Sequence, residues 1–176
     1  AINHVKKENY FLINLTPQGE LLNQKLVSEW TKKTHIIIIC GRYKGIDERV
    51  NLIFKPRQIS IGDYILSGGE IGALVIIEAI TRLLPNVLGN KDSAESDSLQ
   101  RGLLESPLFT RPSDYKKLAV PDILRSGDHR LIADWRKKKS FKKTLQKRPA
   151  LISAETFTKK DLEILLEVLD GRDAEI

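Results

Sequence analysis

An arginine and several acids near the middle of the chain are residues of the types that proton transfer requires. Arg82 follows a long apolar stretch, and Asp92, Glu95 and Asp97 lie in the serine-containing segment after it. A carboxylate on such a segment could act as a general base while the guanidinium stabilises developing negative charge. Ordinary solvated loop acids give the same pattern, so the pattern alone leaves both interpretations open.

Three apolar runs end in small or turn-forming residues. These ends are residues 15–17 (Leu-Thr-Pro), residues 40–43 (Cys-Gly-Arg-Tyr), and residues 61–62 (Ile-Gly) followed by 67–69 (Ser-Gly-Gly). In an open α/β sheet, ligands bind at the carboxyl ends of strands, where a Cβ atom would obstruct the close approach of the backbone. Glycines at strand ends also serve simply as turn formers, and that interpretation stays open.

The motifs of several other chemistries are missing from the sequence. It contains no G-x-G-x-x-G fingerprint, no Walker A sequence and no G-x-S-x-G elbow. The three histidines, His4, His35 and His129, are widely spaced, and no paired His or Cys ligands occur. The sequence therefore argues against a dinucleotide, a nucleoside triphosphate, serine-type acyl transfer and a metal site.

Positive charge is concentrated in one part of the chain. Residues 101–150 carry 14 Lys and Arg against 5 Asp and Glu, whereas the first hundred residues carry 12 against 11. A basic block of this density is typical of a surface that binds a polyanion. A solvated, lysine-rich helix face is the simpler interpretation of the charge run alone.

Alternating strands and helices must position the candidate residues of the first half. Strand-like apolar runs occupy residues 10–15, 35–40 and 58–66, and helical spacing occupies 22–33 and 71–84. The four isoleucines at 36–39 are typical of a parallel strand that is covered on both faces. This order predicts an α/β domain with a mostly parallel sheet. The last helix is apolar nearly all round, so we expect it to be buried in a core or against another subunit.

The second half is predicted to be all-helical. A polar segment at 86–98 without apolar periodicity separates it from the first half. Asp128 is placed to cap one helix and Thr158, with Asp161 three residues on, to cap another. The residues expected to face inward are Leu131, Ile132, Trp135 and Leu145 on the first helix and Leu162, Leu165, Leu166 and Leu169 on the second.

Composition limits the class of the protein and the cellular compartment in which we expect it. Hydrophobic residues make up 41% and charged residues 30% of the 176 residues, an ordinary globular balance. The single cysteine, Cys40, cannot form an internal disulfide, which favours a reducing cytoplasm. The longest apolar run, residues 71–77, is too short to span a bilayer, and no secretory leader precedes it, so we expect no membrane partner. The absence of methionine and the start at Ala1 lead us to expect a processed or incomplete chain.

Six segments follow one another along the chain: CGRYKGIDERV at 40–50, SIGDYILSGGE at 60–70, 82–104 with SAESDSL inside it, FTRP at 109–112, SGDHRLIADWR at 126–136 and KRPALI at 147–152. Any one of them would be weak evidence, but together they cover nearly the whole chain. In this order they resemble consecutive signatures of the bacterial tRNA (guanine-N1)-methyltransferases of the SPOUT class.

The resemblance implies a trefoil-knotted α/β domain, residues 1–90, that lacks the N-terminal part of the family pattern. A linker at 91–105 and a helical tRNA-binding domain at 106–176 follow. It also implies S-adenosylmethionine as cofactor, held largely by backbone at the three strand ends already described. The cofactor-binding residues that the resemblance implies are Leu15, Thr16, Pro17, Gly41, Tyr43, Ile61, Gly62, Asp63, Tyr64, Ile65, Leu66, Gly68 and Gly69.

The implied reaction is methyl transfer to N1 of the guanosine immediately 3′ of the tRNA anticodon. Asp97 matches the family's catalytic aspartate, which would remove the N1 proton, and Arg82 matches its partner arginine. The resemblance implies a homodimer, and we expect its active site to be shared between the two subunits. It leaves open whether Mg²⁺ takes part, through the tRNA or at the active site. The tRNA-binding residues that we expect are Arg111, His129, Arg136, Lys137 and Lys138.

Lys44 departs from the family pattern, which usually has an acidic residue beside the cofactor at this position. Two alternative functions stay open. Another SPOUT enzyme, acting on ribosomal RNA or on a ribose oxygen, would keep the knot but should lack SAESDSL and FTRP. A catalytically inert RNA-binding fragment is compatible with the basic block.

Overall fold

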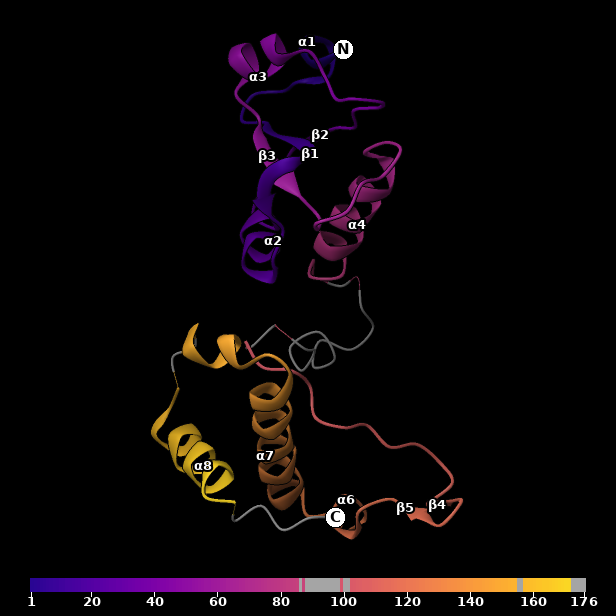
Figure 1. The fold of residues 1–176 in the computed structure, drawn as a ribbon, viewed down its shortest axis with the longest axis vertical. Helices are drawn as coiled ribbons and strands as arrows, with labels where there is room; N and C mark the ends of the chain where they lie inside the picture. Colours follow the sequence, from indigo (N-terminus) through magenta and orange to yellow (C-terminus); the bar gives the residue numbers. More distant parts are fainter. Residues whose placement is uncertain (86, 88–98, 100–101, 155–156, 172–176) are drawn as a thin grey trace. The chain divides into compact units, whose positions relative to one another are not determined.

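The computed structural model describes residues 1–85, 87, 99, 102–154 and 157–171. The chain divides into two compact units, Ala1–Ala94 and Glu95–Ile176, and each is considered by itself (Figure 1). Among the described helices, none is long and apolar enough to cross a membrane.

The first unit is built on a three-stranded parallel sheet. Its strands are β1 (Phe11–Leu21), β2 (Ile36–Ile39) and β3 (Arg57–Ser60), in the order β2-β1-β3. The predicted α/β class with a parallel sheet is thus confirmed. In this unit β2 lies at an edge of the sheet and its four isoleucines are only half-buried, so the expectation of a strand covered on both faces is wrong for this chain.

The helices of the first unit are α1 (Ile2–Val5), α2 (Gln24–Trp30), α3 (Glu48–Phe54) and α4 (Glu70–Thr81). Side chains of β1 alternate between the two faces of the sheet, as the pleat requires. On one face Ile13 packs in a core with Trp30 of α2 and Ile76 of α4, and α2 and α4 contact each other. On the other face the buried Asn14 side chain reaches α3.

A bulge interrupts the pairing of β1 with β3. Leu15 and Glu20 are both opposite Ile59, so residues 16–19 leave the sheet and the strand then resumes. A Cβ atom on Gly19 would lie 2.3 Å from the backbone nitrogen of Ile59, so only glycine permits this return. The sequence predicted that residues 16–19 would end the strand. The sequence thus predicted correctly that the chain leaves the sheet after Leu15, but not that the strand resumes at Glu20.

Two further boundaries differ from the sequence prediction. The third strand ends at Ser60 rather than at residue 66, because Gly62 turns the chain with φ of +150°. Helix α3 lies between residues 40 and 58, where the sequence analysis expected neither a helix nor a strand. The side chain of Asp47 caps it by accepting from the backbone N–H of Arg49. The available signal was an acid three residues before the mostly apolar stretch 50–54.

One face of α4 is exposed in this chain. Gly72, Ala73 and Ile76 are buried, as expected for the side that covers the sheet. The exposed residues are Ile71, Leu74, Val75 and Ile77, which are 60%, 65%, 44% and 51% exposed. A contiguous apolar surface of this kind is typical of a contact with another molecule.

The second unit is mainly helical. It contains the strands β4 (Asp114–Tyr115) and β5 (Leu118–Ala119), the helices α6 (Asp122–Arg125), α7 (His129–Lys147) and α8 (Lys159–Leu169), and the 3₁₀ helix η1 (Pro149–Ala154). Its core joins Leu103, Phe141 and Ile164. The backbone N–H of Leu104 donates to Thr144 Oγ1 at 2.9 Å, and Ser140 Oγ donates to the Leu104 carbonyl. The segment around Leu104 is thus bound to α7.

The helix caps of the second unit were predicted correctly, but the buried helix faces only in part. Of the residues expected to face inward, Leu165 packs against the core and Ile132, Trp135 and Leu145 are half-buried. Asp128 caps α7, and Thr158 with Asp161 forms a capping box on α8. The buried residues of α7 are Ser140, Phe141 and Thr144, and Leu131 is 49% exposed. On α8, Ile164 is buried while Leu162, Leu166 and Leu169 are exposed. The sequence prediction named only apolar residues for the buried faces, whereas here the hydroxyl groups of Ser140 and Thr144 bond to backbone groups in the interior.

We predict that Gly19→Ala destabilises the first unit by about 2 kcal/mol or more, because the added Cβ meets backbone that cannot move aside. Gly41→Ala is the control, since the nearest atom to its Cβ is the movable Cγ2 of Ile46 at 3.1 Å. Urea denaturation followed by circular dichroism measures both. Equal midpoints for the two variants would show that the bulge does not require glycine.

Candidate functional site

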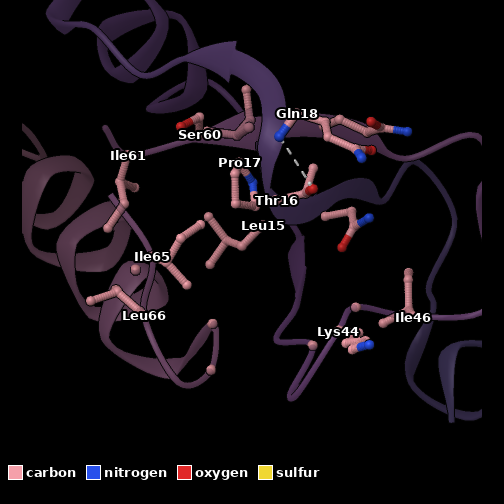
Figure 2. Close-up of a pocket in the computed structure, with 18 of the residues that line it drawn as sticks. Leu15, Thr16, Pro17, Gln18, Lys44, Ile46, Ser60, Ile61, Ile65 and Leu66 are labelled. Atoms are coloured by element: carbon pink, nitrogen blue, oxygen red, sulfur yellow. Dashed lines mark hydrogen bonds between the residues drawn. The ribbon is translucent and has the colours of Figure 1, made fainter. Parts of the chain in front are cut away.

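A pocket of about 640 Å³ lies where β1 and β3 are interrupted or end. Residues 14–18, 41, 43–46, 58–62 and 64–69 contribute most of its wall (Figure 2). The pocket brings together the three strand ends that the sequence singled out. Every residue predicted to bind the cofactor lines it except Asp63: Leu15, Thr16, Pro17, Gly41, Tyr43, Ile61, Gly62, Tyr64, Ile65, Leu66, Gly68 and Gly69.

Two glycine-containing loops touch at the pocket wall. The backbone N–H of Gly69 donates to the carbonyl of Gly41 at 2.9 Å, and Arg42 forms an isolated bridge with Gly68. A Cβ atom on Gly69 would lie 2.8 Å from the Cα of Cys40, so a side chain at this position would separate the loops. Close contact of two backbones is the reason that glycine is needed here.

An exposed ion pair spans the same loops. Arg42 Nε donates to Glu70 Oε1 at 2.7 Å, and this bond holds the pKa of the Glu70 carboxyl below its usual value. Because both side chains are exposed, the pair stabilises the contact only slightly. Burial, and then the charge of Glu70, raises the pKa of the neighbouring Cys40 thiol, so this cysteine is less reactive than an ordinary one.

The loop at 61–66 is shaped by its own hydrogen bonds. Ser60 Oγ accepts from the backbone N–H of Gly62 at 3.2 Å, and it donates to the Gly62 carbonyl at 3.1 Å. Tyr64 Oη donates to the carbonyl of Ile61 at 3.1 Å. The loop therefore presents backbone and the apolar side chains of Ile65 and Leu66 to the pocket (Figure 2).

The pocket also contains polar residues that the sequence prediction missed. Asn14 Nδ2 donates to Asn51 Oδ1 at 3.1 Å, and Asn51 Nδ2 donates to Glu48 Oε2 at 2.8 Å. All three residues line the pocket. The available signal was an asparagine within the apolar run YFLINL, where it must find a partner when buried.

The predicted catalytic residues are not part of the pocket as described. Arg82 is exposed at the C-terminal end of α4, whereas Gly69 and Gly72 line the pocket at its N-terminal end. The rise of the helix separates Gly69 from Arg82 by about 20 Å. Asp97, with Asp92 and Glu95, lies outside the described residues. The described residues also contain no group of three or more His, Cys, Asp or Glu that could hold a metal ion.

The basic side chains of the second unit fall into two groups. Arg111, His129 and Arg136 are exposed. Lys137 and Lys138 are only 31% and 32% exposed and pair with acids of α8: Lys137 Nζ lies 2.9 Å from Asp161 and Lys138 Nζ 2.5 Å from Glu167. Both lysines, which the sequence analysis expected to bind tRNA, are thus only partly exposed. Their side chains join the two helices.

A parallel sheet with a glycine-lined pocket at its strand ends gives the first unit the architecture of an α/β domain, in which ligands usually bind at this edge of the sheet. Residues 1–154 match the family described as tRNA (Guanine-1)-methyltransferase TrmD. The chain belongs to this family, as the resemblance in its sequence predicted.

Its curated relatives carry the name tRNA (guanine-N(1)-)-methyltransferase. The protein of Dictyoglomus turgidum is 51% identical over 168 residues, which are 96% of this chain and 68% of the relative. The proteins of Geobacillus kaustophilus and Carboxydothermus hydrogenoformans are both 50% identical, over 89% and 94% of this chain and 64% and 65% of their own lengths. The chain thus spans about two thirds of the length of these relatives.

We predict that Asp161→Asn lowers the stability of the second unit by about 1 kcal/mol near neutral pH. Burial raises the pKa of the Asp161 carboxyl, but hydrogen bonds from Lys137 and Thr158 outweigh this effect and lower it below 3.8. A carboxyl group whose pKa is lower in the folded state than in the unfolded state stabilises the fold when the pH is above its unfolded-state pKa. This contribution disappears as the pH falls through its folded-state pKa. The difference between wild type and variant should therefore shrink in acid.

The matched control is Asp122→Asn, because Asp122 is 98% exposed and lies 3.5 Å from Arg125. Urea denaturation over a pH series measures both variants. A pH-independent loss at Asp161, or an equal loss at Asp122, would show that the Lys137 pair does not stabilise the unit.

Proposed function

We propose that this chain binds S-adenosylmethionine in the pocket of its first unit. As a homodimer it transfers the methyl group to N1 of the guanosine immediately 3′ of a tRNA anticodon. The observation that carries the proposal is the convergence of three distant segments, predicted from sequence to bind the cofactor, on one pocket. We assign this reaction to the cytoplasm, because its proposed substrate is a tRNA.

The pocket fits such a cofactor. Its volume is within the usual range for small-molecule sites, and its wall is largely backbone and apolar side chain. Gly41 and Gly69 bring two loops into contact, and we propose that this contact belongs to a trefoil knot. The bound cofactor supplies a methyl group that its sulfonium makes electrophilic, so the chain's share is positioning and proton removal.

The distance between Arg82 and the pocket supports a site shared by two copies. One helix separates them by about 20 Å, more than an arginine side chain spans. The exposed apolar residues of α4, Leu74 among them, offer a surface for the second copy. In the dimer, Asp97 of one subunit would take the proton from guanine N1 beside the pocket of the other, and Arg82 would stabilise charge on the guanine O6.

We assign tRNA binding to the second unit, with Arg111, His129 and Arg136 as the main phosphate contacts because their side chains are exposed. Lys137 and Lys138 would add positive potential while remaining paired with α8. Any Mg²⁺ would enter with the tRNA or at the completed active site.

The test of the shared site is complementation between two inactive variants. Asp97→Ala removes the proposed base, and Gly68→Val distorts the pocket wall, because its Cβ would meet side-chain atoms of Glu70 and Arg42. Each variant alone should lose about 10²-fold or more in methyl transfer to tRNA. Asp97→Ala should still bind S-adenosylhomocysteine.

Mixed under conditions of proven subunit exchange, the two variants should recover up to about a quarter of the activity, because half of the dimers are mixed and each has one intact site. The control is each variant exchanged with itself. Exchange without recovery would place both residues in the same subunit's site. An unaltered chain that binds tRNA but not S-adenosylhomocysteine would overturn the enzymatic function in favour of an inert RNA-binding role.

For the second unit we predict that Arg136→Ala lowers the slope of log affinity for tRNA against log salt concentration by about one unit. The reason is that an exposed guanidinium can replace counterions on a phosphate. Lys138→Ala should change the slope less, because its ammonium is paired with Glu167. Arg125→Ala is the control, as this arginine is paired with Asp122 on α6. Filter binding over a salt series would contradict the assignment if Arg136→Ala kept the wild-type slope.

A further inference from the structure

Two charged side chains of opposite sign line the pocket. Among the described residues of its wall, Lys44 and Glu48 are the only charged ones; the others are glycine, apolar or neutral polar. Lys44 follows Tyr43 on the loop beside Ile46 (Figure 2), and Glu48 begins α3. A wall with one cation and one anion is complementary to a zwitterion.

Glu48 is held by a chain of hydrogen bonds that starts in the interior. Asn14 is only 3% exposed, and its amide donates to Asn51 Oδ1, which fixes the orientation of the Asn51 amide. The Nδ2 group of Asn51 therefore points to Glu48 and donates to Oε2. Positioning through a buried partner is what a binding site requires of a side chain that is otherwise exposed.

We propose that Glu48 and Lys44 bind the amino-acid end of the cofactor, a proposal that rests on the function proposed above. Glu48 accepts from the α-ammonium group and Lys44 pairs with the α-carboxylate. Asn14 and Asn51 are positioning residues that act through Glu48. The nucleoside end of the cofactor is uncharged and matches the neutral remainder of the wall.

Charge-matched ligands separate these roles. S-Adenosylhomocysteine carries both charged groups, its decarboxylated analogue carries only the amine, and methylthioadenosine carries neither. Glu48→Gln keeps an oxygen for Asn51 and removes the charge. By calorimetry, the Glu48→Gln variant should bind S-adenosylhomocysteine and its decarboxylated analogue about fivefold to tenfold more weakly than the unaltered chain does. Its affinity for methylthioadenosine should be unchanged.

Lys44→Gln is the matched variant for the other charge. It should weaken the binding of S-adenosylhomocysteine by a similar factor and leave the affinities for the decarboxylated analogue and for methylthioadenosine unchanged. Uniform weakening of all three ligands by either variant would indicate a damaged pocket and overturn the assignment. Unchanged binding of all three would overturn it as well.

A double-mutant cycle tests the positioning role of Asn51. Asn51→Ala should weaken the binding of S-adenosylhomocysteine in the wild-type background and have little further effect in the Glu48→Gln background. The reason is that Asn51 acts on the ligand only by positioning the Glu48 carboxylate. Additive effects would overturn that role.

The outcomes also distinguish this inference from the proposed function. If the unaltered chain binds S-adenosylhomocysteine and the variants bind it equally well, only the charge assignment fails. If the unaltered chain binds methylthioadenosine as tightly as S-adenosylhomocysteine, the pocket recognises only the nucleoside and the charge assignment again fails. If it binds none of the three ligands, the cofactor site and this inference fail together.

Discussion

The contact between the loops around Gly41 and Gly69 is the constraint on which the rest of the first unit depends. The Gly69 amide reaches the Gly41 carbonyl because Gly69 has no side chain to separate the two backbones. This contact joins the end of β2 to the start of α4. Gly41, Gly69 and Gly72 line the pocket, so the contact holds together this part of its wall.

Polar groups within apolar surroundings give both units their specific geometry. In the first unit, buried Asn14 joins β1 to Asn51 of α3 and so connects the sheet to the charged side of the pocket. In the second, Ser140 and Thr144 of α7 hold the segment around Leu104 by its backbone. Leaving such groups unpaired would cost about 1–3 kcal/mol each, so they restrict the chain to arrangements in which every partner is present.

Helix α4 relates the pocket to the predicted catalytic arginine. Its first residues line the pocket and its last lead to Arg82, so the length of the helix keeps the two apart within one chain. The exposed apolar side of the same helix is the surface that a second copy could cover. The shared active site and the dimer contact on α4 that we propose would therefore be two consequences of one geometric feature.

The sequence by itself determined the α/β class, the parallel sheet, the helix caps at Asp128 and Thr158, and the family, because these depend on local pattern and on motif order. Of the residues that it assigned to the cofactor, all except Asp63 line the pocket, but it missed the pocket residues Asn14, Glu48 and Asn51.

Only the tertiary structure decided which faces of α7 and α8 are buried, because the pairing of Lys137 with Asp161 and the backbone partners of Thr144 come from elsewhere in the chain. It also decided the return of β1 after its bulge and the chain from Asn14 to Glu48. Both depend on contacts between residues more than thirty positions apart, which no local pattern specifies.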